Sequence, residues 1–358
     1  MSIRYIAAVP RRRATGRVAE VYAQSSADFG QPAFQMLSPA PEVHAAAWAL
    51  LRESELVGRA PRVAKEAVAV AVSAANGCRF CLDAHAILVH ATGEHELAED
   101  LLHGRTPADP ALAGLVAWAK ATDPPGALPF PVDLAPEYLG TVLSTHFTNR
   151  MFSTLTTETL LPGNLQRSRS VRRVAGRTLA GAVNRTLSAG DSLPLLAELP
   201  SGAEPAWAAG TAIGTAYAAL LAASARGGTL LGEDATAAVA GAVAEWDGAD
   251  PPHGFALAQG LLRWLVPADR PAARLAMLAA LAPGRLTDAD VAAWRTKDHT
   301  DADLVRLLAF GAMTAVLRIE ELITDHFAVG RPDEVPAARP VTPSVIPALS
   351  PQRVTTRR

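Results

Sequence analysis

The stretch RVAKEAVAVAVSAANGCRFCLDAHAILVHA, residues 62–91, decides the fold. Within it, residues 67–72 alternate alanine and valine as a strand would. The length of the apolar segment, its alanine content and Pro61 at its start nevertheless favour a helix over residues 62–75. Asn76-Gly77 tolerates a left-handed backbone and ends this helix. The stretch therefore predicts two consecutive helices joined by a tight turn.

Helical patterns continue on both sides of this pair. Hydrophobic residues make up 49% of the chain and aromatic residues only 5%, with alanine, leucine and valine in the majority. This composition favours helices that pack closely through small side chains over a β-sandwich. We expect an all-α fold. Short helices are predicted before residue 60, further helices over 78–91, 94–103, 110–121 and 135–155, and a second helical block over about 206–327.

Breaks in the helical pattern, several of them at prolines, predict four parts of the chain. They are a helical domain with both cysteines at 1–165, an arginine-rich helical connector at 166–205, a second helical domain at 206–330 and a proline-rich tail at 331–358. The five arginines between 167 and 177 indicate a solvated connecting helix, with anion or partner binding as the alternative. The tail is expected to be disordered or draped over the surface.

Three co-linear similarities indicate an internal duplication of one helical unit. Val72–Gly77 resembles Val243–Gly248, and the segments around Trp118 and Asp133 resemble those around Trp294 and Asp303 at nearly equal offsets. In this alignment the second copy has lost the polar residues of the first: opposite Glu66, Cys78, Cys81 and His85 it carries Ala237, Ala249, Pro252 and Ala256.

Charge and composition exclude several classes of protein. The formal net charge is -2, so no global field attracts nucleic acid or an anionic membrane. The first 13 residues contain no apolar core of a signal peptide. The uncharged stretch 205–225 is rich in alanine, glycine and threonine, which indicates a buried helix and not a membrane span. We expect a cytoplasmic protein in a reducing compartment.

The residues that carry chemistry lie in one short segment. Cys78 and Cys81 are spaced i,i+3, and His85 follows Cys81 at i,i+4, so all three share one face of a helix. Glu66 lies in the preceding helix, which the Asn-Gly turn folds back toward the thiols. A CxxC pair can close and reopen a disulfide, histidine moves protons near neutral pH, and a carboxylate among apolar helices suits a general base.

Two other readings of the same residues stay open. A structural zinc site needs four ligands, whereas Cys78, Cys81 and His85 supply three and His90 lies off their face. The pair also suits a non-catalytic redox sensor or interaction protein on the same helical scaffold. We favour redox catalysis, and expect no metal and no cofactor.

The pattern Glu-x11-Cys-x2-Cys-x3-His, with Asn-Gly before the first cysteine, resembles the core of AhpD-like alkylhydroperoxidases in the carboxymuconolactone decarboxylase superfamily. The segment His146-Phe-Thr-Asn-Arg-Met-Phe152 also looks like the later helix of longer members. The resemblance covers about Leu56 to Phe152. Some members carry a histidine directly before the second cysteine, where this chain has Phe80, which implies a shorter proton relay.

This resemblance implies an AhpD-like helical bundle and a role for each residue. Cys81 would be the peroxidatic cysteine, Cys78 the resolving one, and Glu66 with His85 the proton relay. The dipole of the helix favours instead Cys78, which lies nearer the N-terminus, as the thiolate; we follow the resemblance. It further implies reduction of an organic hydroperoxide or hydrogen peroxide, a dithiol reductant protein of lipoyl or thioredoxin-like type, and a homo-oligomer.

His146 and Asn149 are candidates for the substrate pocket. They are neighbours on the helix expected over residues 135–155. A hydrogen bond that packs this helix against another one explains the two residues equally well.

Overall fold

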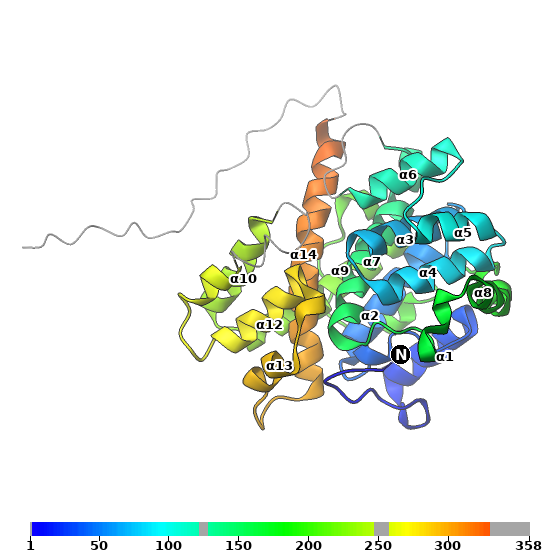
Figure 1. Cartoon of the computed structure of the whole chain (residues 1–358). Coiled ribbons are helices and arrows are strands. Elements are labelled where there is room, and N and C mark those ends of the chain that lie inside the picture. Colours follow the sequence, from blue (N-terminus) through cyan, green and yellow to red (C-terminus); the bar gives the residue numbers. More distant parts are fainter. Residues whose placement is uncertain (1, 122–127, 247–257, 330–358) are drawn as a thin grey trace, which may run out of the picture.

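The computed structural model describes residues 2–121, 128–246 and 258–329 (Figure 1). In these residues every named element is a helix, and the remaining backbone pairing is an isolated antiparallel bridge between Ile3 and Thr156. This confirms the predicted all-α fold class. None of the described helices is long and apolar enough to cross a membrane.

The helices predicted in the first half of the chain are present, with ends that agree within one residue. This half contains α1 (Gly16–Phe29), α2 (Pro41–Leu51), a π-helical turn (Arg52–Leu56), α3 (Arg62–Ala75), α4 (Arg79–Ala91), α5 (His95–Leu102), α6 (Pro110–Lys120), α7 (Ala135–Leu155) and α8 (Arg169–Val183). The agreement arises because the turn residues and prolines mark the ends of helices directly in the sequence.

Helix α3 lies at the centre of the first half, where it packs against α4, α6 and α7. Its residues from Ala64 to Ser73 are all buried. Alanine and valine let neighbouring backbones approach closely, which explains why the alternating segment 67–72 is compatible with a buried helix. Gly77 follows with a φ of 64°, a left-handed conformation that glycine adopts without strain, and it reverses the chain into α4.

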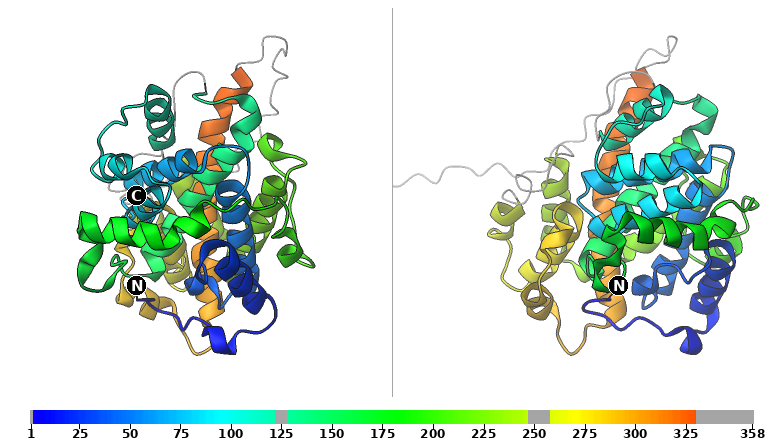
Figure 2. Two further views of the ribbon diagram at one scale, coloured as in Figure 1. Left: turned by 90° about the vertical axis from the view of Figure 1, so that its right-hand side faces the viewer. Right: turned by 45° about the vertical axis from the view of Figure 1, so that its right-hand side comes forward.

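The second half consists of α9 (Ala212–Ala225), α10 (Glu233–Ala244), α12 (Arg270–Leu281), α13 (Asp288–Trp294) and α14 (Asp301–Val329). Figures 1 and 2 show the long helix α14 between the helices of the first half and the group formed by α10, α12 and α13. Helix α14 packs against α12 on one side and against α7 and α9 on the other. Among the described residues, one continuous hydrophobic cluster includes both halves.

The duplication remains a prediction. Helix α10 begins at Glu233, the position that the repeat aligns with Arg62 at the start of α3. Ala249, Pro252 and Ala256, which the alignment places opposite the two cysteines and the histidine, lie outside the described residues. The proline-rich tail 331–358 also lies outside them.

The arginine-rich segment is helical and largely solvated, as the sequence predicts: of its five arginines, four are exposed (Arg167, Arg169, Arg173 and Arg177) and one, Arg172, is buried. The segment forms α8, which packs against α4. A Cβ atom on Gly176 of α8 would lie 2.7 Å from the Cβ atom of His90, so glycine permits this close approach. Arg172 is buried, because Glu99 on α5 accepts hydrogen bonds from its guanidinium group, whereas Arg169 stays at the surface.

Candidate active site

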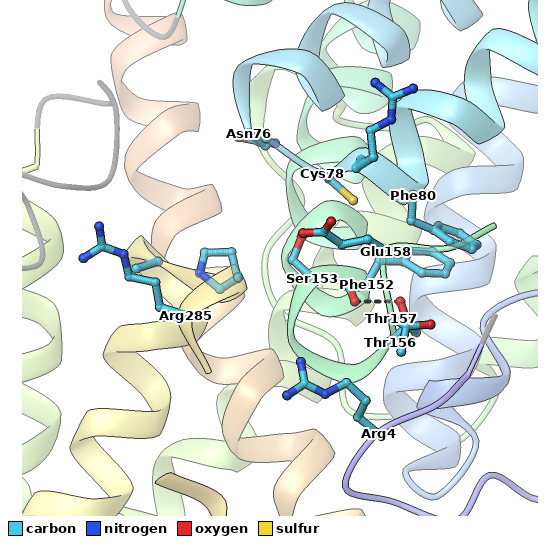
Figure 3. A pocket seen from close by; sticks show the side chains of 15 residues that line it. Arg4, Asn76, Cys78, Phe80, Phe152, Ser153, Thr156, Thr157, Glu158 and Arg285 are labelled. Carbon is cyan, nitrogen blue, oxygen red and sulfur yellow. Dashed lines mark hydrogen bonds between the residues drawn. The ribbon is translucent and has the colours of Figure 1, made fainter. Parts of the chain in front are cut away.

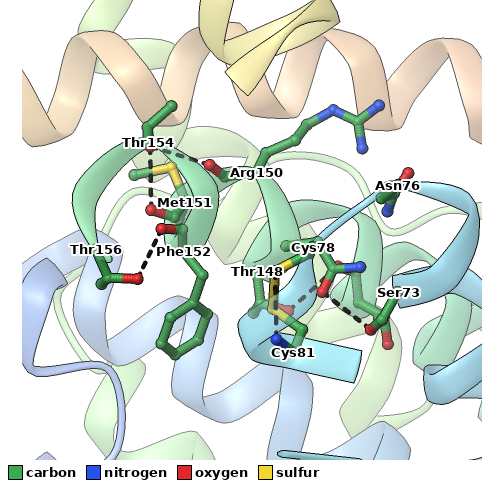
Figure 4. The surroundings of a disulfide bond; sticks show 12 residues. Ser73, Asn76, Cys78, Cys81, Thr148, Arg150, Met151, Phe152, Thr154 and Thr156 are labelled. Atoms are coloured by element: carbon green, nitrogen blue, oxygen red, sulfur yellow. Dashed lines mark hydrogen bonds between the residues drawn. A yellow bond between two sulfur atoms is a disulfide. The ribbon is translucent and has the colours of Figure 1, made fainter. Parts of the chain in front are cut away.

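The turn between α3 and α4 places the two cysteines. Cys78 is the N-cap residue of α4, its backbone N–H bonds to the carbonyl of Ser73 at 3.0 Å, and its sulfur accepts a hydrogen bond from the Cys81 N–H at 3.4 Å. The Cα atoms of Cys78 and Cys81 are 5.4 Å apart and their sulfurs form a disulfide (Figure 4). Both cysteines are buried. The structure therefore shows the oxidised form of the CxxC pair.

Glu66 and His85 are in direct contact. Glu66 lies on α3, is fully buried, and accepts a hydrogen bond from His85 Nδ1 at 2.8 Å. Its other oxygen accepts from the Arg62 guanidinium, one turn earlier on α3, at 2.8 Å. The antiparallel arrangement of α3 and α4 thus brings together the two residues that the sequence paired. This contact fixes the Nδ1 proton of His85 and the orientation of its ring.

A third ionisable group, Glu55, completes the cluster, and the sequence reasoning missed it. Glu55 lies in the π-helical turn after α2, is buried, and its Oε1 is 3.5 Å from His85 Nδ1. No spacing rule connects it to the CxxC motif, because it belongs to a different helix and a π-turn changes the face on which it lies. The polar run Arg52–Glu55 gives no sign in the sequence that Glu55 is buried.

The three groups shift one another's protonation. Burial, followed by the charge of Glu66, raises the pKa of Glu55 to about 7. Burial would raise the pKa of Glu66 as well, but Arg62 and His85 outweigh it and lower that pKa. Burial lowers the pKa of His85, but Glu55 and Glu66 outweigh it and raise that pKa above its usual value. These directions favour the charged forms of Glu66 and His85 and place the titration of Glu55 near neutral pH.

Among the described residues, Glu55, Glu66 and His85 form a group with the spacing of metal ligands. Each offers one ligand atom, and these atoms lie within 4.8 Å of one another. The Arg62 guanidinium already supplies a positive charge next to Glu66, 2.6 Å from its Oε1. Proton sharing within the cluster thus accounts for its geometry. The arrangement differs from the zinc alternative, since Cys78 is bonded to Cys81 and His85 to Glu66.

Two cavities lie on opposite sides of the disulfide. One, of about 410 Å³, is lined mainly by apolar side chains and contains Cys81, His85 and Glu55 but not Cys78. The other, of about 560 Å³, contains Cys78 but not Cys81, and arginines and other polar residues form much of its wall (Figure 3). Each cysteine of the disulfide therefore lines its own cavity.

Phe80 and Phe152 separate the two cavities. Both side chains line each cavity, and their rings stack with centroids 4.6 Å apart and an interplanar angle of 18°. Phe80 occupies the position where some AhpD-like proteins carry a histidine. In this structure, the residue at that position builds an apolar wall and takes no part in the proton cluster.

Comparison with known proteins places this site in a family. Residues 41–121 match the carboxymuconolactone decarboxylase family. Over 333 residues, the chain is 40% identical to a protein of Mycobacterium tuberculosis named "Alkyl hydroperoxide reductase Rv2159c", an alignment that covers 88% of this chain and 94% of that protein. The chain belongs to the carboxymuconolactone decarboxylase family. No solved structure matches it.

The family segment contains the whole cluster. Glu55, Glu66, Cys78, Cys81 and His85 all fall within residues 41–121. The similarity to the mycobacterial relative extends well beyond this segment, so the second half of the chain is shared as well. This confirms the family resemblance that the motif indicated.

His146 and Asn149 lie outside the matched family segment, on α7. Both are buried, and neither lines either of the two cavities. His146 Nδ1 is 3.0 Å from the Asn76 side chain, and Asn149 Oδ1 accepts from Ser73 at 3.3 Å. The two residues thus join α7 to the end of α3, and their role in substrate binding stays a prediction.

Proposed function

We propose that this protein is a thiol-dependent peroxidase that reduces hydroperoxides through Cys81, with Cys78 as the resolving cysteine. One observation carries the proposal. Cys81 lines an apolar cavity together with His85 and Glu55, and His85 is hydrogen-bonded to Glu66. The name of the mycobacterial relative, an alkyl hydroperoxide reductase, supports this activity.

The reaction begins from the reduced form. The His85 imidazolium, held by Glu66, stabilises a thiolate on Cys81 one helical turn away. This thiolate attacks the distal oxygen of the peroxide, the O–O bond breaks, and the electron pair leaves with the alkoxide. The products are a sulfenic acid on Cys81 and, once the alkoxide takes a proton, an alcohol.

Glu55 is the source of that proton in this mechanism. It lines the same cavity as Cys81, and the pKa of its carboxyl is raised to about 7 by burial and by the charge of Glu66. A carboxylic acid poised near neutral pH is an effective general acid. His85 and Glu66 stay charged throughout, so they hold the thiolate while Glu55 protonates the leaving group.

The second step produces the state seen in the structure. The Cys78 thiol attacks the sulfenic sulfur of Cys81, a disulfide forms and water leaves. The two residues are adjacent on the first turn of α4, so this condensation needs no large rearrangement. A dithiol reductant then restores the thiols. The lipoyl or thioredoxin-like nature of this reductant and a homo-oligomeric assembly remain predictions from the family resemblance.

The apolar cavity favours organic hydroperoxides over hydrogen peroxide. Its wall includes Trp48, Leu51, Phe80 and Leu179, which offer buried apolar surface to an alkyl or aryl group. Hydrogen peroxide has no apolar group that can use this surface. We therefore expect cumene hydroperoxide to react faster than hydrogen peroxide.

Trapping of the sulfenic acid tests the two roles. The reduced Cys78→Ser variant should accumulate a sulfenic acid on Cys81 after one equivalent of cumene hydroperoxide, and dimedone should label it. The reduced Cys81→Ser variant should show no label. Label on Cys78 of the Cys81→Ser variant, at a rate equal to that of Cys81, would overturn the assignment of roles.

A further inference from the structure

We propose that the disulfide is used from two sides: peroxide reaches Cys81 through the apolar cavity, and a negatively charged thiol reductant reaches Cys78 through the polar cavity. The proposal rests on the peroxidase function above. It adds which sulfur the reductant attacks, by which route, and what kind of group it carries. It also gives a role to the second half of the chain.

The direction of attack follows from the geometry of thiol–disulfide exchange. A reductant thiolate attacks one sulfur and expels the other as a thiolate, so the leaving thiolate needs stabilisation. Attack on Cys78 expels Cys81, which lines the same cavity as His85 and lies one helical turn from it. Attack on Cys81 would expel Cys78 on the side away from the protonated cluster. The cluster therefore favours entry at Cys78.

Access by itself does not select one sulfur, because Cys78 is 2% and Cys81 3% exposed, but it gives each cysteine a separate route through the cavity that it lines. The polar cavity is thus the route by which a reductant reaches Cys78. The stacked rings of Phe80 and Phe152 stand between this cavity and the apolar one. A polar reductant on the Cys78 side is thereby kept out of the peroxide site.

The charge of the cavity wall indicates the kind of reductant. Arg4, Arg79 and Arg285 line it, against a single acidic residue, Glu158. Asp83 neutralises Arg79, and Asp288 lies 3.6 Å from Arg4 but is exposed to solvent. Arg285 is exposed at the far wall, across the cavity from Cys78 (Figure 3). With Glu158 and Asp83 counted against the three arginines, one positive charge is left, and it attracts an anionic thiol.

The far wall of this cavity comes from the second half of the chain. Residues 282–285, between α12 and α13, face the turn 76–80 and the end of α7 across the cavity. The second half carries no cysteine, but it builds one side of the entrance to Cys78. This explains how a half without redox residues takes part in the reaction.

Reduction proceeds in two balanced steps. The first thiolate forms a mixed disulfide with Cys78 and releases the Cys81 thiolate. A second thiolate attacks the reductant sulfur of that mixed disulfide and releases the Cys78 thiolate. Two reductant thiols thus become one disulfide, and the enzyme gains two electrons and, from the solvent, two protons.

The site of attack is tested on the oxidised protein, without peroxide. Two monothiols of equal reach serve as probes, neutral 2-mercaptoethanol and anionic 2-mercaptoethanesulfonate. After acid quench and alkylation, mass spectrometry should find the adduct on Cys78 and the alkylated thiol on Cys81. An adduct mainly on Cys81 would overturn the proposal.

The route is tested by filling each cavity in turn. Gly284 has open space around it, and Gly284→Trp should slow reduction by either thiol by at least about fivefold, because access to the sulfur limits exchange. The peroxide-driven formation of the disulfide should stay unchanged. Ala175→Phe, in the wall of the apolar cavity, should slow the peroxide-driven formation of the disulfide and leave its reduction by the two thiols unchanged. Gly181→Trp, at an exposed position that lines neither cavity, is the control.

Circular dichroism checks that each variant folds, and Gly284→Leu replaces Gly284→Trp if that variant does not. The two routes would be contradicted if the substitution at Gly284 slowed disulfide formation by peroxide and reduction by thiols equally, or if it slowed neither reaction. Failure of the peroxidase proposal looks different, because peroxide would then form no disulfide while the thiols still reduce a preformed one.

The charge preference is tested with the same two thiols at equal thiolate concentration. The wild type should react about threefold faster with the sulfonate, and Arg285→Glu should remove this preference, since electrostatic steering depends on the local field. Arg12→Glu, an exposed arginine in neither cavity, should keep it. Equal rates of the two thiols on the wild type would contradict an anionic reductant.

Discussion

At the scale of single residues, the sequence predicted the site residues that the pair α3 and α4 and the turn between them position. Helical spacing placed Cys81 and His85 on one face, and the Asn-Gly turn brought Glu66 back toward His85. Cys78, predicted on the same face, is instead the N-cap residue of α4 and lines the other cavity. Glu55 was out of reach of this reasoning, because its position depends on how the π-helical turn packs against α3 and α4. Local periodicity describes one helix at a time and contains no information on that packing.

Replacement of Glu55 changes how stability depends on pH. The pKa of Glu55 is raised in the folded state, to about 7, so its contribution to stability is present at low pH and is lost as the pH rises through 7. Oxidised wild-type protein should therefore lose stability between pH 6 and pH 9. The loss should be smaller in Glu55→Gln, by on the order of 1 kcal/mol.

Urea denaturation of the oxidised proteins at both pH values measures this difference, and the oxidised form avoids titration of the thiols. The charge of Glu55 is the largest influence that raises the pKa of His85, whose contribution to stability is lost in the same direction, so the difference between the two proteins reports the Glu55–His85 pair together. Identical losses in the two proteins would mean that Glu55 is already ionised at pH 6.

At the scale of secondary structure, the helix ends were predictable and the packing of α8 was not. Asn76-Gly77 marked the end of α3 in the sequence, and the structure agrees. The arginines of α8 suggested a solvated face. Burial of Arg172 depends on its acidic partner Glu99 on α5, which no pattern within the segment can reveal.

The two ion pairs of α8 should therefore differ in their effect on stability. Arg172→Leu removes a buried cation and leaves Glu99, which also contacts His90, buried without its charge partner. We expect it to destabilise the protein by about 3 kcal/mol. Arg169→Leu, which breaks the exposed pair with Glu96, should cost less than about 1 kcal/mol.

Chemical denaturation of both variants measures the two values, and Arg169→Leu is the matched control because it lies on the same helix. Because α8 lines the apolar cavity through Ala175, Thr178 and Leu179, Arg172→Leu should also slow the peroxide step. Equal, small effects of the two substitutions would show that α8 packs through apolar contacts alone.

At the scale of the whole molecule, Arg150 connects the two halves. It lies on α7, is buried, donates to the carbonyl of Ala280 on α12 at 2.9 Å, and lies over the ring of Trp246 at 5.4 Å from its centroid. Because this contact and the hydrophobic cluster are shared by both halves, we expect the two halves to unfold as one unit. The sequence predicted two helical blocks, but not a common core, because the repeat pattern describes each block separately.

Arg150→Leu should weaken the whole protein and not one half. It leaves the Ala280 carbonyl without its donor and removes the contact with the Trp246 ring, and we expect a loss of about 3 kcal/mol in the free energy of unfolding. Denaturation followed by circular dichroism and by tryptophan fluorescence should show coincident transitions for wild type and variant. Two separate transitions in the wild type would contradict a single folding unit.

The most direct measurement of the central claim is steady-state consumption of cumene hydroperoxide with a dithiol reductant, for wild type, Cys81→Ser and Cys78→Ser. We predict repeated turnover by the wild type and complete loss of turnover in Cys81→Ser. Cys78→Ser should consume one equivalent and then stop or slow greatly. A wild type that forms its disulfide once and does not turn over with any dithiol would contradict a peroxidase and indicate a redox sensor on the same helical scaffold.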